Sequence, residues 1–529
     1  MSPGPGASVV RLEPQAPGGV QDTALEASTA ELLSLGGDGR IHLDAAGRAN
    51  RYGCAPRPDE TLVAFGSSTA STISRDAFAA ADRLRARLLN ALAHAAPETV
   101  YELEAERLRA ELLGLYGLDG RGVEMVLAPS GTDLHLFAGQ LLDAGARPPL
   151  AIIPEETETG SGVPAALAGR SLSGPTPLGP AGGRPDAFAE IEVRAVAARA
   201  TDGQPRDPDE VDRQVQALAE DAVAGGRAVL LVLIDVSKTG LISPSPSCAL
   251  GLAERFPGKV TVLVDGCQLR LTGRTLAAYL DRGAMVAVTG SKFLTGPAFS
   301  AALMIPPMLA ARFAERPLPA ALQAVSASAD WPVGWAARSS LRPAANFGVL
   351  LRWAAALEEL QRFAAVSDAQ VQAVAASLER AARDAIGAHP ELEPLQVRPL
   401  DRGLGPVGWD AVKTIFPFLM RASPDGPWLS RAETERLWRL MREDLGGSAL
   451  SEDLQVRAAA RLRIELGQPV AAGIRDGEPV SALRLCLSSR LVCEASAGDP
   501  RAAARILSDC RLAFVKAAWL AREVGSSRL

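Results

Sequence analysis

The chain has 529 residues, 47% of them hydrophobic, which is enough for a large core and indicates two or more domains. Its formal net charge of −6 argues against a nucleic-acid partner, because binding phosphate backbones requires a basic face. The first residues lack the basic start and apolar core of a secretory signal, and no apolar run reaches the roughly 18 residues of a membrane span. We therefore expect a cytoplasmic protein without a membrane partner.

The N-terminal third begins with residues 1–38, whose Pro, Gly and Ala content predicts a flexible or loosely docked arm. A short strand is predicted at 41–43. Residues 76–116 have a helical pattern in two pieces, divided near Ala96-Pro97. Six apolar runs follow that predict strands, at 123–127, 150–153, 228–234, 260–264, 285–289 and 301–305. The run at 228–234 shows no alternation, as expected of a strand buried on both faces.

Helical stretches separate most of these runs, which favours an α/β fold with a mainly parallel central sheet sandwiched by helices. The Gly-, Pro- and Ser-rich stretch 169–185 is predicted to be a surface loop. After residue 342 the pattern changes to a long helix at 346–389, strand signals at 412–416 and 482–487, and a final helix at 500–524. We therefore predict an arm (1–38), a large α/β domain (39–342) and a smaller C-terminal α+β domain (343–529).

Unusual residues follow three of the predicted strands, where ligands bind in open parallel sheets. The first set is Pro129-Ser130-Gly131-Thr132-Asp133. Glycine permits a tight turn, and the helix that follows offers free N–H groups and a positive dipole end, which together suit a phosphate. We call residues 130–132 the phosphate cup. Taken alone, the same residues also fit an ordinary helix N-cap.

The second set is Val264-Asp265-Gly266-Cys267-Gln268. A carboxylate that closes a buried strand is costly unless it is paired, and a protonated heterocyclic nitrogen is a suitable partner. A capping or salt-bridged aspartate is the alternative interpretation of Asp265.

The third set is Thr289-Gly290-Ser291-Lys292, followed by Gly296-Pro297. A lysine directly after a buried strand is a candidate Schiff-base amine, because burial and nearby cations favour the neutral amine. Thr289 and Ser291 flank the turn and can both reach a phosphate. A solvated loop lysine is the alternative interpretation of Lys292.

Together these motifs resemble those of fold-type I enzymes dependent on pyridoxal 5′-phosphate (PLP), particularly the class V aminotransferase and cysteine desulfurase group. That group has Val-Asp-(Gly/Ala)-Ala-Gln at one strand end and Ser-x-His-Lys-x-x-x-Gly-Pro at the next. The resemblance extends over roughly residues 40–515 through three further segments: Ile41-His42-Leu43-Asp44-Ala45-Ala46, Val236-Ser237-Lys238-Thr239-Gly240 and Ala482-Leu483-Arg484-Leu485-Cys486-Leu487.

The resemblance implies a role for each matching position, and no metal. Lys292 would form the Schiff base with PLP and then shuttle protons, and Asp265 would pair with the pyridinium nitrogen. Gln268 would bind the ring hydroxyl, and Arg484 would grip the substrate α-carboxylate. Gly131, Thr132, Thr289 and Ser291 would hold the phosphate. The resemblance also implies a homodimer whose small-molecule substrate is an amino acid.

Some positions depart from the family pattern. Ser291 stands where a histidine often precedes the lysine, and Lys238 takes the place of an asparagine at the ring hydroxyl, where it would alter cofactor electrostatics or point to solvent. The residue that stacks on the ring is not identifiable within 154–160, and His135 is interpreted as structural. Gly446-Gly447-Ser448-Ala449-Leu450 has leucine where one desulfurase subgroup has its persulfide cysteine.

We therefore predict a PLP-dependent, aminotransferase-like enzyme. A PLP-dependent lyase of specialised metabolism, acting by C–S, C–C or β-elimination chemistry without a persulfide, uses the same residues. A non-catalytic PLP-fold binding module and an unrelated nucleotide binder are weaker alternatives, the latter because no Gly-x-Gly-x-x-Gly or Walker-type loop is present. The six cysteines have no CxxC spacing, so neither a zinc site nor a disulfide framework is expected.

Overall fold

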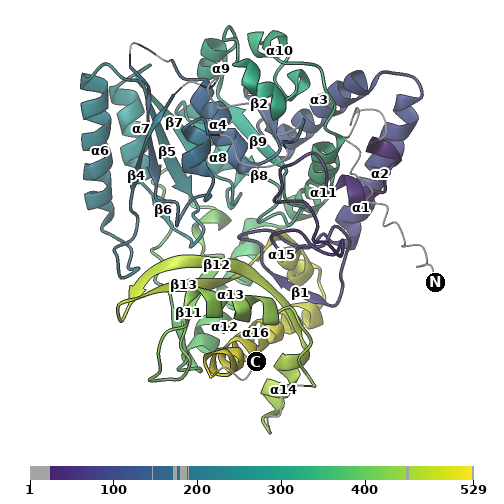
Figure 1. Ribbon diagram of the computed structural model, residues 1–529, viewed down its shortest axis with the longest axis vertical. Helices are drawn as coiled ribbons and strands as arrows, with labels where there is room; N and C mark the ends of the chain where they lie inside the picture. Colours follow the sequence, from purple (N-terminus) through teal and green to yellow (C-terminus); the bar gives the residue numbers. More distant parts are fainter. Residues whose placement is uncertain are drawn as a thin grey trace, which may run out of the picture.

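The computed structural model describes residues 24–143, 145, 147–170, 176–178, 188, 190–447 and 452–526. They form two sheets, each with its own helices, which occupy the upper and lower parts of the molecule in Figure 1. The large sheet has eight strands in the order β2-β9-β8-β7-β5-β3-β4, with β6 paired to β5. The small sheet has five, in the order β1-β12-β13-β11-β10.

The large sheet is mainly parallel, as predicted. Its strands are β2 (Glu124–Ala128), β3 (Leu150–Pro154), β4 (Glu192–Val196), β5 (Val229–Asp235), β6 (Ile242–Ser243), β7 (Val260–Asp265), β8 (Met285–Thr289) and β9 (Ala301–Ile305). The five strands β4, β3, β5, β7 and β8 run parallel to one another, whereas β9 runs antiparallel to both β8 and β2, and β6 runs antiparallel to β5. Every residue of β5 is buried, which explains its unbroken apolar run.

Helices cover both faces of this sheet, so side chains that alternate along a strand enter two different cores. On β5, Val229, Leu231 and Leu233 join one core, and Leu230 and Val232 join the other. The first core lies against α2 (Arg75–Leu92), α3 (Pro97–Leu115), α6 (Pro208–Ala224), α7 (Pro246–Arg255), α8 (Gly273–Asp281) and α11 (Phe347–Ala364). The second lies against α4 (Gly131–Gln140), α5 (Val163–Leu167), α9 (Pro307–Phe313) and α10 (Ala336–Ser340). The predicted sandwich of helices is therefore confirmed.

The small sheet is built mostly from the C-terminal part of the chain. Its strands are β1 (Leu62–Phe65), β10 (Leu392–Pro394), β11 (Ile415–Met420), β12 (Arg463–Arg475) and β13 (Glu478–Cys486). Its helices are α12 (Asp368–Gly387), α13 (Arg431–Leu440), α14 (Leu454–Arg461), α15 (Ser489–Ser496) and α16 (Pro500–Gly525). β1 pairs in parallel with β12, although it lies within the range predicted for the large domain.

Short elements complete the described chain. They are α1 (Thr29–Leu32) and the 3₁₀ helices η1 (Ala24–Glu26), η3 (Ala320–Ala324), η4 (Ser328–Asp330) and η5 (Trp409–Ala411). Of the predicted arm, residues 1–23 lie outside the described residues, and so does most of the predicted loop 169–185. Residues 24–38 are docked rather than free, with Leu25, Leu32 and Leu33 buried in the core.

Two predicted elements were wrong. Residues 41–43 form no strand, because the backbone turns there and Ile41 N donates to Asp38 O at 3.1 Å. The single helix predicted for 346–389 is two helices, α11 and α12. Ser367 ends the continuity because it caps a new helix through a reciprocal capping box with Gln370.

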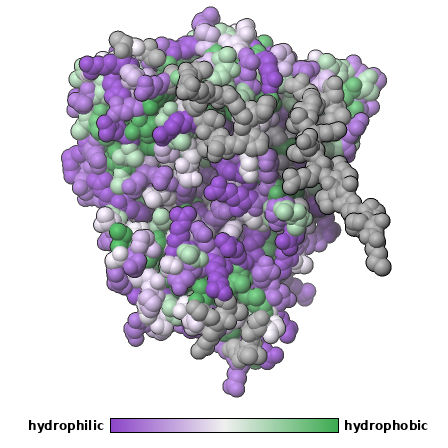
Figure 2. Space-filling model, viewed as in Figure 1, coloured by the Kyte–Doolittle hydropathy of each residue, from purple (hydrophilic) through white to green (hydrophobic). Residues whose placement is uncertain are grey.

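The surface seen in Figure 2 is mostly hydrophilic, with hydrophobic residues in small separate areas. In the described part of the chain, no helix combines the length and the apolar character that crossing a membrane requires.

Candidate active site

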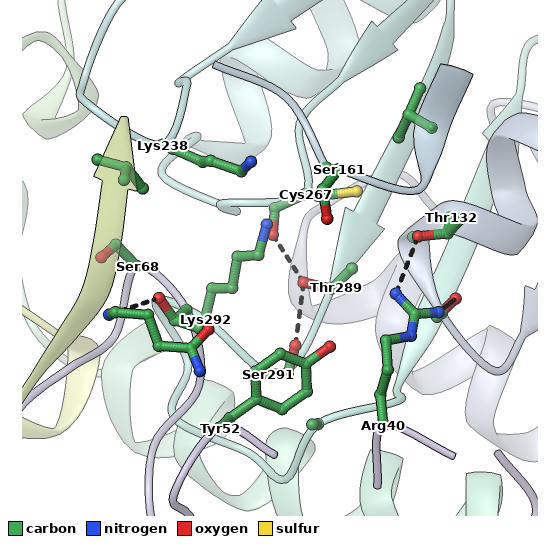
Figure 3. A pocket seen from close by; sticks show the side chains of 18 of the residues that line it. Arg40, Tyr52, Ser68, Thr132, Ser161, Lys238, Cys267, Thr289, Ser291 and Lys292 are labelled. Atoms are coloured by element: carbon green, nitrogen blue, oxygen red, sulfur yellow. Dashed lines mark hydrogen bonds between the residues drawn. The ribbon is translucent and has the colours of Figure 1, made fainter. Parts of the chain in front are cut away.

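A cavity of about 360 Å³ opens where the carboxyl ends of the large sheet meet the small domain. Its size lies within the range of roughly 300–1,000 Å³ that small-molecule sites occupy. Its walls include Ser130, Asp265 and Lys292 from strand ends of the large sheet and Arg484 from β13. The structure therefore brings the three predicted strand-end motifs to one cavity, which Figure 3 shows from close by.

The phosphate cup lies at the N-terminus of α4. Ser130 caps this helix: its Oγ accepts from Asp133 N at 3.3 Å, and the Asp133 carboxylate accepts from Ser130 N at 2.9 Å. Ser130, Gly131 and Thr132 nevertheless line the cavity, so the N-cap and the open cup coexist. A Cβ added to Gly131 would lie 2.7 Å from Cys267 Sγ, so only glycine lets α4 approach the end of β7 this closely.

Thr289 and Ser291 complete the same side of the cavity. Thr289 Oγ1 donates to Cys267 O at 2.7 Å, and Ser291 Oγ donates to Thr289 Oγ1 at 3.4 Å, as the dashed lines in Figure 3 mark. Both residues line the cavity, and their predicted contact with a phosphate stays a prediction.

Arg40 contacts the phosphate cup, a contact that sequence reasoning missed. Its guanidinium donates to Thr132 Oγ1 and to Ser130 Oγ, both at 3.2 Å, and pairs with Asp38 at 2.7 Å. It lies directly before the Ile41-His42-Leu43 motif, but nothing in the local sequence indicates that it reaches α4.

Asp265 ends β7 with only 5% of its surface exposed. Its carboxylate accepts from Thr159 Oγ1 at 2.9 Å and from Cys267 N at 3.2 Å. Burial raises the pKa of Asp265, but the charges of His135 and Lys292 together with these hydrogen bonds outweigh burial and leave the pKa below its ordinary value. Asp265 is therefore an ionised, buried carboxylate at the cavity wall.

His135, interpreted from the sequence as structural, lines this cavity. Its Nδ1 lies 2.7 Å from Gly131 O, and its Nε2 lies 3.6 Å from Asp265 Oδ2. Nε2 is buried without a hydrogen-bond partner, and the ring lines the cavity. Its position four residues after Gly131, one helical turn along α4, was the available signal. The loop after β3 contributes Glu156, Thr157 and Gly160 to the lining, none of which carries a ring.

Lys292 projects into the cavity from the turn after β8 (Figure 3). Its strand neighbours the one that ends in Asp265, and only α8 separates β7 from β8 along the chain. Among the described residues, no carboxylate lies within 4.0 Å of its Nζ. Lys292 is one of only five lysines in the chain.

Gln268 is held away from the cavity. Its Nε2 donates to Ser68 O at 3.0 Å, and only 2% of its surface is exposed. Ser68 lines the cavity, whereas Gln268 does not. The predicted contact between Gln268 and a ring hydroxyl therefore stays a prediction, and Gln268 is not among the residues that line the cavity.

Lys238 and Arg484 form the opposite side of the cavity. Lys238 points into it (Figure 3), and its Nζ donates to Glu156 O at 2.9 Å. Burial and then the charges of Arg484 and Lys292 lower the pKa of Lys238 to about 8. Arg484 is 2% exposed and donates to Thr69 Oγ1 at 2.8 Å, to Gln468 O and to Lys238 O. It is therefore not a surface arginine, and burial lowers its pKa to about 10.

A buried carboxylate fixes the turn that carries Lys238. Glu158, 1% exposed, accepts from Ser237 Oγ at 2.6 Å, from Thr239 Oγ1 at 2.7 Å and from Arg199 Nε at 2.6 Å. Backbone bonding adds to this, because Lys238 N donates to Glu158 O at 3.0 Å. The loop after β3 therefore sets the position of Lys238.

The six cysteines show whether a persulfide could form in the cavity. All six are free, and Cys267 is the one that lines the cavity. Burial raises the pKa of the Cys267 thiol well above its ordinary value, which disfavours the nucleophilic thiolate. Leu450, which replaces the persulfide cysteine, lies outside the described residues. No group of three or more potential metal ligands occurs in the part of the chain that the structure covers.

Neither the protein-family models nor the curated protein sequences give a match to this chain. Solved structures do. A C-DES mutant with glycine covalently linked to its PLP cofactor is 16% identical, with a TM-score of 0.50 over 86% of this chain and 99% of that one. C-DES, a cystine C–S lyase, in complex with cysteine persulfide is 16% identical, with a TM-score of 0.49 over 86% and 97%. Oryza sativa TDC with PLP and tryptamine is 14% identical, with a TM-score of 0.47 over 88% and 83%.

At these identities the likeness carries the fold and nothing finer. The chain has the fold-type I architecture that the sequence motifs predicted.

Proposed function

We propose that this protein is a PLP-dependent enzyme that acts on an amino acid, with the cofactor attached to Lys292. One observation carries the proposal: an unpaired amine, a buried ionised carboxylate and an open helix N-terminus meet at one cavity, on Lys292, Asp265 and the phosphate cup. A binding module without catalysis has no need to keep a charged aspartate buried beside a free lysine.

The residues fit the three anchoring points of the cofactor. The N–H groups and hydroxyls of the phosphate cup, with Thr289, Ser291 and Arg40, supply donors and positive charge for the phosphate. Asp265 supplies an ionised acceptor for the ring nitrogen, and the orphaned Nε2 of His135 lies beside it. Lys292 supplies the amine. Ser68, held by Gln268, faces the same cavity.

When bound, PLP supplies an electron sink that stabilises negative charge developing at the substrate Cα. The chain's own residues do the rest. Arg484 binds the substrate α-carboxylate, which fixes the bond at Cα that is to break. Lys292, freed when the substrate amine takes its place on the cofactor, would be the base that removes the Cα proton and returns it. Asp265 keeps the ring nitrogen protonated.

We propose aminotransferase-like chemistry as the reaction type. Persulfide chemistry is disfavoured because Cys267 is the one cysteine in the cavity wall and is a buried thiol. Lyase chemistry would begin at the same residues, so a panel of amino acids distinguishes the two. Release of a keto acid with conversion of the cofactor to its amine form supports transamination, and release of ammonia or sulfide supports elimination.

The test of cofactor attachment is direct. The purified protein is expected to gain visible absorbance with PLP, and borohydride is expected to fix one cofactor on the peptide that contains Lys292. Lys292→Ala should abolish the trapped cofactor, whereas Lys259→Ala, at an exposed lysine outside the cavity, should retain it. Trapping that survives in Lys292→Ala, or a protein that stays colourless with PLP, would contradict the proposal.

The homodimer implied by the resemblance and the cytoplasmic location expected from the sequence belong to the same proposal. Sedimentation of the holoenzyme tests the first of them. A fully active monomer at assay concentrations would refute it.

A further inference from the structure

We infer that the amino acid accepted at this site carries a second negative charge on its side chain, and that Lys238 binds it. The inference rests on the proposed function, because it assigns one cation of the cavity to the cofactor and another to the substrate α-carboxylate. It concerns the class of substrate, which neither the fold nor the motifs decide.

The cavity wall holds an excess of positive charge. Its basic side chains are Arg40, Arg51, Lys238, Lys292, Arg431 and Arg484, and its acidic ones are Glu156 and Asp265. Two of the cations already have carboxylate partners: Arg40 pairs with Asp38 at 2.7 Å and Arg431 with Glu435 at 3.1 Å.

The cations on the side of Lys238 have no such partner. Within the described ranges, no carboxylate oxygen lies within 4.0 Å of Lys238, Lys292 or Arg484. Lys238 and Arg484 donate only to neutral oxygens of Glu156, Thr69, Gln468 and Lys238 itself. Buried charges without a counter-charge are costly, which indicates that an anion completes this wall.

The electrostatic field of the neighbouring side chains at Lys238 is also positive. Arg484 and Lys292 act on it more strongly than the carboxylates that face it, Glu158 and Glu156. Glu158 is already shared by Arg199, Ser237 and Thr239, and Glu156 is exposed. Lys238 is therefore a held cation in a positive field, which is the environment that attracts an anionic ligand.

Assigning each cation leaves Lys238 and Arg51, and Arg51 is exposed and therefore solvated. Lys292 is committed to the cofactor, Arg40 lies at the phosphate cup, and Arg484 suits the α-carboxylate. Lys238 remains, held half-buried beside Arg484. A side-chain carboxylate on an amino acid held by Arg484 would meet Lys238, whereas a neutral side chain would leave it unpaired. The substrate class is therefore a dicarboxylic amino acid.

The experiment compares pairs of equal size and unequal charge. Holoenzyme is titrated with L-glutamate against L-glutamine and with L-aspartate against L-asparagine, and the change in cofactor absorbance gives a Kd without turnover. At least one acid is expected to bind about tenfold or more tightly than its amide, the usual magnitude for a charged hydrogen bond. Because Lys238 loses its proton above its pKa of about 8, this preference should fade as the pH rises through that value.

Matched variants locate the effect. Lys238→Met should abolish the preference by weakening acid binding much more than amide binding, and Lys238→Arg should restore the preference. Lys259→Met is the control outside the cavity and should behave as wild type.

Equal Kd values for acid and amide in the wild type, or a preference that survives in Lys238→Met, would overturn the inference. A third outcome would also overturn it. If Lys238→Met changes the cofactor spectrum before any amino acid is added, and acid and amide bind alike, then Lys238 serves the cofactor and not the substrate. These outcomes leave cofactor attachment at Lys292 intact. A protein that takes up no PLP overturns the proposed function itself, and wild type alone settles the question if Lys238→Met fails to fold.

Discussion

The two sides of the cavity differ in how their charges are satisfied. On the cup side, Arg40 pairs with Asp38, Asp133 forms a capping box with Ser130, and Asp265 accepts two hydrogen bonds beside His135. On the opposite side, Lys238 and Arg484 lie close together with only neutral acceptors. The cup side is preorganised before any ligand arrives, whereas the Lys238–Arg484 side is incomplete without an anion.

This difference separates two tasks. A cofactor that stays bound benefits from preset donors, because little reorganisation is then needed. A substrate that comes and goes can instead supply the missing charge itself. Substitutions on the cup side should therefore change cofactor affinity, and those on the Lys238–Arg484 side should change amino-acid affinity.

The largest expected effect on the cup side is that of Asp265→Asn. It removes the buried carboxylate that we propose pairs with a protonated ring nitrogen, and losing one partner of a buried charge pair costs about 2–5 kcal/mol. We expect PLP affinity to fall by that amount and Cα-proton exchange to be nearly lost, measured by equilibrium dialysis and by deuterium incorporation.

Thr159→Val is the matched control for Asp265→Asn. It removes one neutral donor to Asp265 and keeps the charge, so a loss of only about 1 kcal/mol is expected. Equal effects of the two variants would show that the charge of Asp265 is not what matters.

The next largest effect is expected from a steric change at the phosphate cup. Gly131→Ala places a Cβ 2.7 Å from Cys267 Sγ, and overpacking of this kind costs about 1–3 kcal/mol. We expect a lower midpoint of thermal unfolding and weaker PLP binding. The double variant Gly131→Ala/Cys267→Ala removes the clashing sulfur and should recover most of both losses. No recovery would mean that Gly131 is needed for its backbone conformation rather than for space.

The sequence predicted the cup side better than the opposite side, for a physical reason. The residues of the cup, Asp265 and Lys292 each follow a buried strand, and the carboxyl ends of neighbouring parallel strands meet at one edge. Short motifs and strand patterns were therefore enough to place them together. The charge state of the Lys238–Arg484 side depends on β13 meeting the turn after β5, a contact between residues 246 positions apart.

The contacts that the sequence failed to predict also join residues far apart in the chain. Arg40 reaches the cup across 92 positions to Thr132, and Gln268 is drawn to Ser68 across 200, so local sequence carried no sign of either contact. His135 was different, because its place one turn after Gly131 put it on the cavity side of α4. In the fold, β1 was missed because it pairs with β12, far along the chain, and has no buried run of its own.

The smallest expected effect tests whether Arg40 belongs to the cup. Its side chain is 22% exposed and its guanidinium is shared with Asp38, so Arg40→Met should weaken PLP binding by only about 1 kcal/mol. Affinity for pyridoxal, which lacks the phosphate, should change less, because Arg40 donates to cup residues and pairs with Asp38, whereas toward the rest of the cavity it contacts Phe299 and Tyr52. Arg51→Met, which removes an exposed cation of the same cavity without cup contacts, is the control and should leave both affinities as they are. If Arg40→Met lowers the affinity for pyridoxal as much as that for PLP, Arg40 shapes the cavity generally, and the division between a preset cofactor side and an open substrate side fails at this residue.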